Sequence, residues 1–299
     1  MRSFNIDDIY IDDLINTRML PDIFKYRCIT KDSDILNKKF LEELAKQINI
    51  NPENLEIYHT WFKIQDKYYY FKYRYLFEEL FMEKIFNVFS VSCVKHKIVK
   101  CNGRVGIISE NFRKKDCEYI DYADIISKDT DVPLSIIKYN EVIETKMKKF
   151  DFNIYLGIVS KIIAIDIMFG QYDHRYYNIM FEKSNEHLKL APMFDNGNIF
   201  KENNRPDTYI FESCFDTLIF SANENHIDEH TIETITNYPE LYKSLEKALD
   251  INLSKIFNKL KRDFQMEVYV ELKEQIQKYY DLHCKMVEKT LKLVDKYGI

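Results

Sequence analysis

Three polar residues between positions 173 and 197 have the spacing of a phosphate-transfer site. Asn178 follows Asp173 by five positions and precedes the apolar run Ile179–Phe181. A second acid, Asp195, comes 22 positions after Asp173 and is followed by an Asn-Gly pair. Phosphoryl transfer from ATP needs one carboxylate that orients the acceptor hydroxyl and takes its proton, and oxygen ligands that hold magnesium beside the phosphates. We therefore expect Asp173 to be the catalytic base, and Asn178 and Asp195 to hold Mg²⁺.

Two charged residues near this set have two interpretations each. Arg175, two positions after Asp173, is assigned to the catalytic group because a guanidinium is a fork of donors that suits the γ-phosphate. Its alternative is a solvated arginine that pairs with a nearby acid. Asp166 lies inside an apolar helix candidate. A buried carboxylate persists only when its oxygens are satisfied, so we favour a structural role with bonds to loop N–H groups over catalysis.

The elements that must position these residues appear as a change in sequence period. Two aromatic-rich runs, Thr60–Ile64 and Tyr68–Arg74, flank a polar turn and predict a β-hairpin. Lys97–Lys100 and Gly103–Ser109 predict a second hairpin around an Asn-Gly turn. Helices are expected, in chain order, over residues 34–48, 76–90, 150–169, 240–262 and 266–297. After about residue 133 only residues 170–200 break the helical period, so we expect an α+β fold with a small sheet before a larger helical region.

The stretch from Ile167 to Gly197 resembles the HipA-like serine/threonine kinases, and most closely their short stand-alone members. The catalytic loop of that family reads roughly LxGNxDRHxxN and is followed by xAPxFDxG. The same register here reads Ile167-Met-Phe-Gly-Gln-Tyr-Asp-His-Arg-Tyr-Tyr-Asn178 and Leu190-Ala-Pro-Met-Phe-Asp-Asn-Gly197. Arg175 stands where the family has histidine, and His174 precedes it. The Asp-Asn-Gly ending is also similar to that of type II phosphatidylinositol kinases and secretory-pathway atypical kinases.

The resemblance implies an atypical protein-kinase-like fold with two lobes. Residues 51–112 would form the N-lobe, a small sheet with one helix, and residues 113–299 the larger, mostly helical C-lobe. Residues 1–50 would be a helical, acidic N-terminal extension. The fold analogy places a lysine on the third strand and a glutamate on the following helix, and Lys72 and Glu79 fit these positions, with Glu78 and Glu83 as neighbouring acids. The segment Ser109–Phe112 would be the hinge that binds adenine, through Glu110 and Asn111.

Two features keep other functions open. The chain has no glycine before Gly103, so no glycine-rich loop precedes Lys72. Strand alternation also puts Tyr70 on the same face as Lys72, where it would narrow or cover an adenine pocket. The main prediction is an ATP- and Mg²⁺-dependent protein kinase. The alternatives are a nucleotide-binding pseudokinase or interaction module, and a small-molecule or lipid kinase.

Composition excludes several other classes. The net charge of −5 argues against nucleic acid as a direct partner. The six cysteines show no CxxC spacing, so neither a zinc site nor a redox dithiol is indicated. The Asp-rich start is not a signal peptide, and no apolar stretch approaches the ~20 residues needed to cross a bilayer, so no membrane is expected. The resemblance implies a bacterial, cytoplasmic enzyme, or a secreted effector, with a protein substrate and an antitoxin or other regulatory protein as partners.

Overall fold

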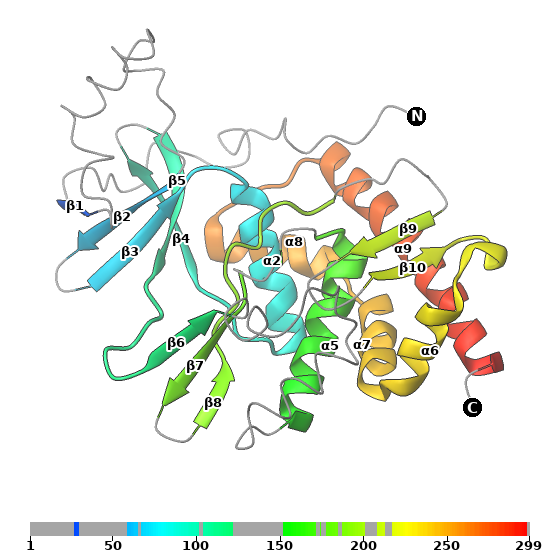
Figure 1. The fold of residues 1–299 in the computed structure, drawn as a ribbon. Helices are drawn as coiled ribbons and strands as arrows, with labels where there is room; N and C mark the ends of the chain where they lie inside the picture. The colour runs from blue at the N-terminus through cyan, green and yellow to red at the C-terminus, as the bar shows by residue number, and fades with distance from the viewer. Residues whose placement is uncertain are drawn as a thin grey trace, which may run out of the picture.

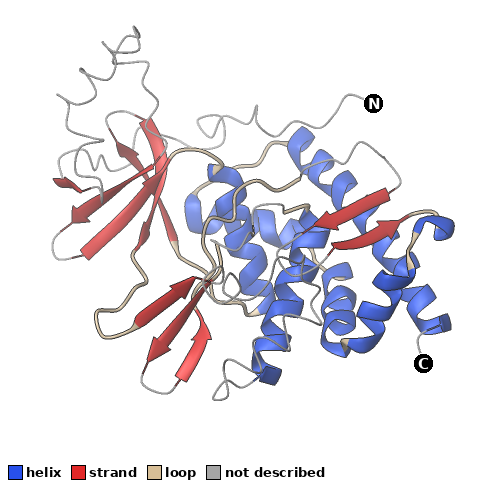
Figure 2. Ribbon diagram, in the orientation of Figure 1, coloured by secondary structure: helices blue, strands red, loops and turns tan. Residues whose placement is uncertain are grey.

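The computed structural model describes residues 27–29, 59–64, 67–101, 104–121, 152–171, 174, 178–184, 187–200, 208–212 and 217–297. Within these residues, a five-stranded sheet comes first and a mainly helical part with two smaller sheets follows (Figure 1). Figure 2 shows the same division by colour, with most strands on one side, the helices on the other, and a two-stranded sheet among the helices. This arrangement confirms the expected α+β fold. The expected helix over residues 34–48 lies outside the described residues.

The five-stranded sheet is antiparallel throughout, in the order β1-β2-β3-β5-β4. Its strands are β1 (Arg27–Ile29), β2 (His59–Ile64), β3 (Lys67–Lys72), β4 (His96–Cys101) and β5 (Arg104–Glu110). Both predicted hairpins are confirmed, because β2 pairs with β3 and β4 pairs with β5. The edge strand β1 comes from the segment assigned to an N-terminal extension, and it pairs with Trp61–Lys63 of β2. The boundaries at residues 50 and 112 stay predictions.

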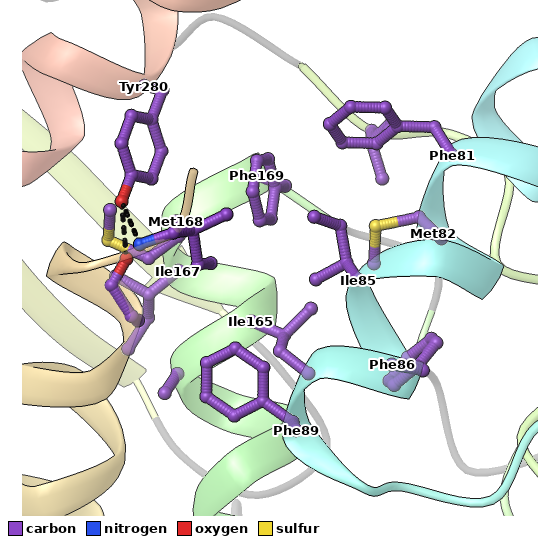
Figure 3. Packing of buried hydrophobic residues seen from close by; sticks show 14 of the residues in the cluster. Phe81, Met82, Ile85, Phe86, Phe89, Ile165, Ile167, Met168, Phe169 and Tyr280 are labelled. Carbon is purple, nitrogen blue, oxygen red and sulfur yellow. Dashed lines mark hydrogen bonds between the residues drawn. The ribbon is translucent and has the colours of Figure 1, made fainter. Parts of the chain in front are cut away.

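The predicted helix after β3 is confirmed as α2 (Leu76–Phe89), and it is buried on nearly every side. Only Asn87 and Val88 of its residues are not buried. Helix α5 (Phe152–Phe169) matches the expected long apolar helix and packs against α2. Phe81 of α2 contacts Phe169 of α5 edge-on, with ring centroids 5.4 Å apart. Figure 3 shows how side chains of the two helices face each other in one apolar core.

The helical part contains a hairpin that the sequence analysis missed. Strands β9 (Thr208–Glu212) and β10 (Thr217–Ser221) pair where only helices were expected, so that prediction was wrong. Tyr209, Phe211, Leu218 and Phe220 are buried at alternate positions. That period of two is the strand signal, and it is weak over five-residue strands. A further sheet joins β6 (Glu118–Asp121), β7 (Met180–Ser184) and β8 (His187–Leu190) in that order.

The single helix expected over residues 240–262 is two helices, α7 (Pro239–Leu249) and α8 (Leu253–Phe264). Two interactions end one helix and start the next. The Tyr280 hydroxyl accepts from Ile251 N at 3.0 Å and donates to Ala248 O at 2.7 Å (Figure 3). The Asn252 side chain accepts from Lys255 N at 3.0 Å and caps α8. Because Tyr280 lies far along the chain from the residues it binds, local periodicity could not reveal the break between α7 and α8.

The remaining elements are a 3-10 turn (Glu224–His226), α6 (Glu229–Asn237) and α9 (Val270–Tyr297). Helix α9 confirms the expected C-terminal helix, although it begins four residues later, and it packs on α5, α6, α7 and β10. None of the helices that the structure describes is long and apolar enough to cross a membrane.

Gly106 gives a test of the contact between β3 and β5. A Cβ added there would lie 2.3 Å from Phe71 Cε2 and 2.7 Å from the Lys72 carbonyl oxygen. We expect Gly106→Ala to lower the free energy of unfolding by about 1–3 kcal/mol, because one strand must move. The measurement is urea unfolding followed by circular dichroism.

Gly157→Ala is the matched control. Gly157 lies inside α5, and an added Cβ would meet nothing within 4 Å. Alanine should therefore raise the free energy of unfolding by about 0.5–1 kcal/mol. Equal stability of both variants and the parent would show that the β3–β5 pairing is misplaced.

Candidate active site

Lys72, at the end of β3, lies between two carboxylates. Its Nζ is 2.6 Å from Glu79 Oε1 and also contacts the Asp195 carboxylate. The side chains of Lys72 and Glu79 are 15% and 2% exposed, whereas that of Asp195 is 43% exposed. Two charges are thus withdrawn from water and a third stays accessible. This arrangement brings the strand, the helix and a residue 123 positions later into one cluster.

The three charges support one another. Burial alone would lower the pKa of Lys72, but the Glu79 and Asp195 carboxylates outweigh it and raise the pKa. Burial alone would raise the pKa of Glu79, but the Lys72 ammonium, His96 and hydrogen bonds leave it below the usual range. Both groups are therefore charged at neutral pH. This is the favourable form of a buried ion pair, in which each charge has hydrogen-bonding partners.

Tyr70 is close enough to this cluster for its charges to act on the phenol. Burial first, and then the Asp195 carboxylate, raise the pKa of Tyr70 to about 12. The hydroxyl is therefore protonated at neutral pH and remains a donor. This agrees with the strand alternation that puts Tyr70 on the face of Lys72.

The turn Asp195-Asn196-Gly197 is fixed against the start of α2. Asn196 N donates to Glu79 Oε2 at 3.0 Å. A Cβ at Gly197 would lie 2.6 Å from Tyr75 Cβ, so only glycine allows this approach. Asp195 itself has a φ of 54°, a left-handed conformation that costs energy for a residue with a side chain. The carboxylate of Asp195 is therefore aimed by its neighbours and not by a relaxed backbone.

A second polar cluster lies behind the turn. His174 Nδ1 is 2.8 Å from each carboxylate oxygen of Asp166, and His174 Nε2 is 3.1 Å from Asn196 Oδ1. Asp166 is fully buried, as the structural interpretation requires. The partner shown here is the His174 ring, whereas the sequence analysis expected loop N–H groups. Gln171 adds a further bond, from its Nε2 to the carbonyl oxygen of Gly197 at 2.9 Å.

No family model and no curated protein sequence matches this chain. Solved structures do match its fold, and two of them are as follows. The proinflammatory kinase CtkA of Helicobacter pylori is 11% identical, with 83% of this chain and 96% of that chain covered and a TM-score of 0.59. The HipA, HipB and operator DNA complex of the Shewanella oneidensis MR-1 toxin–antitoxin system contains a chain that is 12% identical, with coverage of 91% and 73% and a TM-score of 0.52.

The chain has a HipA-like kinase fold. At such identities the likeness concerns the fold alone, so it does not assign a role to any residue. On this fold, Glu79 is the α2 acid that pairs with Lys72, as the sequence analysis expects. Glu83, one turn further, pairs instead with Lys84 at 3.2 Å and with His96.

His96 is a site residue that sequence reasoning missed. Its backbone N donates to Glu83 Oε2 at 2.9 Å, and its Nδ1 lies 3.0 Å from the same oxygen. Its Nε2 is 3.9 Å from Glu79 Oε2. His96, the first residue of β4, therefore lies between Glu79 and Glu83 of α2. No local signal marks it, because a histidine at the start of a strand has no distinctive spacing.

The other predicted site residues have different outcomes. Asp173 and Arg175 lie outside the described residues. Asn178 is half-buried just before β7. Glu110 is exposed and pairs with Lys67 at 2.8 Å, while Asn111 N donates to Tyr68 O at 2.8 Å. The assigned roles of all five residues stay predictions, and the donor that Asn111 would offer to adenine is already in use.

The segment around the expected hinge is nevertheless linked to the 195–197 turn. Phe112 stacks on Phe194, which directly precedes Asp195, with ring centroids 5.6 Å apart. Phe112 also meets Tyr119 of β6 edge-on at 5.8 Å. These contacts join the end of the five-stranded sheet to the loop that carries Asp195.

The described side chains around Lys72 do not by themselves form a complete cage for a metal ion. Among the residues described, no group of three or more His, Cys, Asp or Glu side chains could hold a metal ion. Cys93, Cys117 and Cys284, the cysteines whose side chains are described, are free thiols. Asp195 is the carboxylate of the Lys72 cluster that an ion can reach, because its side chain is 43% exposed.

Glu79 predicts an acid-dependent loss of stability. Its pKa is lower in the folded chain than the ordinary value of 4.5, so its charge stabilises the fold above pH 4.5. That contribution is lost as the pH falls through the folded pKa, below 4.5. Glu79→Gln should cost about 1–3 kcal/mol at pH 7 and should flatten the pH dependence between pH 5 and 3. Urea unfolding at several pH values measures both effects.

Glu110→Gln is the control, because the Lys67–Glu110 pair is exposed and such pairs contribute little. An acid slope for Glu79→Gln as steep as that of the parent would contradict the Lys72–Glu79 pair.

Proposed function

We propose that the chain is an ATP- and Mg²⁺-dependent serine/threonine protein kinase of HipA-like type. One observation carries the proposal. A partly buried ammonium group, that of Lys72, is held between Glu79 of α2 and Asp195 of a distant turn, on a HipA-like kinase fold. Phosphoryl transfer needs a positioned cation for the phosphates and a carboxylate beside it, and catalysis then follows from positioning and electrostatics.

Each residue of the cluster has a role in this proposal. Lys72, oriented by Glu79, binds the α- and β-phosphates. Its charge is secured because the pKa of Lys72 is raised by the two carboxylates, against the effect of burial. Tyr70 keeps its proton at neutral pH, since its pKa is about 12, and borders the nucleotide. Contacts to adenine come from the segment Ser109–Phe112.

Magnesium fits the residues present. Asp195 and Asn178 offer the oxygen ligands that Mg²⁺ prefers, and Mg²⁺ is usually bound by one or two carboxylates together with substrate phosphates. The lack of a complete cage among the described residues agrees with this mode. The ion would neutralise charge on the β- and γ-phosphates.

Asp173 is the proposed base, with Arg175 beside the γ-phosphate. Chain connectivity supports this assignment, because the neighbouring His174 is bonded to Asn196, next to Asp195. Successive Cα atoms are only about 3.8 Å apart. A base must come within hydrogen-bond reach of the acceptor hydroxyl, and we assign that role to Asp173 from the sequence pattern.

A protein substrate and a regulatory protein partner are part of the proposal. One matched structure is a toxin–antitoxin complex of HipA with HipB and operator DNA. By analogy we propose an antitoxin or other regulatory protein for this chain, and a cytoplasmic location. The net charge of −5 favours protein over direct nucleic-acid contact.

A nucleotide-binding module without transfer is the second candidate. Lys72 contacts Asp195 directly, so a metal ion and Lys72 compete for the same carboxylate. The chain also has no glycine before Gly103, which leaves the phosphates without a glycine-rich loop. These two observations favour weak metal use, and the next experiment separates the candidates.

Asp195→Ala tests the role of magnesium. We expect ATP to raise the melting temperature of the parent more with Mg²⁺ than with EDTA, because bound ligand stabilises by RT ln(1 + [L]/Kd). The variant should lose the magnesium-dependent part of the shift and all transfer of label from γ-labelled ATP. Asp281→Ala, an exposed acid on α9, should behave as the parent. If ATP raises the melting temperature equally with and without Mg²⁺, in the parent and in Asp195→Ala, and no label is transferred, the kinase proposal is wrong and the nucleotide-binding module is favoured.

Asp173→Asn tests the base. The change keeps the size of the side chain and removes its ability to take a proton. We expect ATP and Mg²⁺ to shift the melting temperature as in the parent, and label transfer to fall by about 10²–10⁴-fold. Asp116→Asn, at an exposed position, is the control. Transfer at the parental rate in Asp173→Asn would remove this residue from the mechanism.

A further inference from the structure

Three buried polar side chains join α5 to the 195–197 turn, and the proposed phosphoryl transfer does not use them directly. Asp166, His174 and Asn196, here called the α5 relay, are 0%, 2% and 0% exposed. They come from a helix, the stretch after it and the turn. Burying such groups costs free energy unless each bond is made, so packing alone does not explain them.

The relay has a defined direction. A carboxylate only accepts, so His174 Nδ1 donates to Asp166, whose two oxygens are both 2.8 Å away. The ring is thereby oriented with Nε2 toward Asn196 Oδ1, at 3.1 Å. An amide oxygen also only accepts, so Nε2 carries a hydrogen as well and the ring is an imidazolium that donates to both partners. Phe86 of α2 lies against the ring, with centroids 6.0 Å apart. Asp166 therefore sets the orientation of His174, and His174 sets that of the Asn196 amide.

Asn196 is held at an energetic cost. Within the described part of the chain, its Nδ2 is buried and has no hydrogen-bond partner. An unsatisfied buried donor costs about 1–3 kcal/mol. An apolar side chain would avoid that cost but could not accept from His174. The hydrogen bond from His174 therefore explains why an amide side chain occupies position 196.

The turn needs such support because its backbone is strained. Asp195, Asn198 and Phe200 have φ values of 54°, 74° and 61°. Residues in this region persist only where the surroundings determine their conformation. Glu79 holds the backbone of Asn196, and Gln171 holds that of Gly197. Within the α5 relay, His174 holds the side chain of Asn196, next to Asp195.

We propose that His174 is a positioning residue of the phosphoryl-transfer site. Held by Asp166, it fixes Asn196 and through it the orientation of the Asp195 carboxylate. This inference rests on the proposed function. Loss of the relay leaves Lys72 and Glu79 in place to bind nucleotide, so it lowers kcat and leaves KM for ATP nearly unchanged.

Asn196→Leu is the primary test, because leucine has a similar size and the change leaves the Asp166–His174 pair intact. We expect kcat for ADP release with ATP and Mg²⁺ to fall by about 10–100-fold, while KM for ATP stays within about threefold of the parent. Asp166→Asn, which keeps the size of the side chain, should shift kcat in the same direction. Asp166→Asn replaces Asn196→Leu as the test if the leucine variant does not fold.

Thr231→Val is the matched control. Thr231 is fully buried on α6, and its Oγ1 accepts from Ile219 N at 2.8 Å. Its loss should lower the melting temperature without changing kcat. If the relay variants lower only the melting temperature, as Thr231→Val does, the positioning role is overturned.

Hydrogen exchange gives a readout that needs no activity. Peptides that cover residues 195–200 should exchange faster in Asn196→Leu than in the parent, and should not change in Thr231→Val. If the parent transfers no phosphate and gains no stability from Mg²⁺ with ATP, the proposed function fails, and exchange alone decides whether the relay holds the turn. Unchanged exchange over residues 195–200 in both relay variants overturns the proposal.

Discussion

A lysine that is withdrawn from water keeps its charge only where partners such as carboxylates compensate for the lost hydration, and this constraint organises the molecule around Lys72. One acid, Glu79, comes from the helix that follows the strand, and the other, Asp195, comes from the opposite side of the fold. Both partners of Lys72 therefore lie outside the five-stranded sheet. The strand, the helix and the turn must therefore all be in place before the ammonium group is stable.

Helix α2 carries this constraint into the core. Its apolar residues pack against α5 and α8, while its charged residues are also buried and paired. Lys84 Nζ lies 3.0 Å from Asp263 and 4.1 Å from the centre of the Phe264 ring, at the end of α8. Glu79 and Glu83 meet Lys72 and His96 from the sheet. The same helix thus couples the sheet to the helical part through both apolar and ionic contacts.

The parts of this arrangement that follow a regular period could be predicted from the sequence. Local periodicity predicted the third strand and the helix that follows it, and the resemblance to HipA-like kinases then indicated Lys72 and Glu79 on those two elements. The α5 relay could not be found that way, since Asp166 and Asn196 are 30 positions apart and meet through His174. The two short strands after residue 207 were missed because five residues carry little periodicity.

Helix ends that depend on a side chain far along the chain could not be predicted from the sequence either. The break between α7 and α8 depends on Tyr280, 29 positions after the residue it binds, Ile251. For Asp173 and Arg175 the sequence pattern remains the basis of assignment, as they lie outside the described residues.

The burial of α2 also has a consequence for how the chain is made. Synthesis proceeds at about 5–20 residues per second, and α8, which covers one side of α2, emerges more than 160 residues after it. A helix that buries five phenylalanine or methionine side chains must therefore wait about ten to thirty seconds on the ribosome for that cover. During that time its apolar side chains lack the partners that bury them in the folded chain. Nor can the nascent chain assemble the Lys72 cluster before residue 195 has left the exit tunnel.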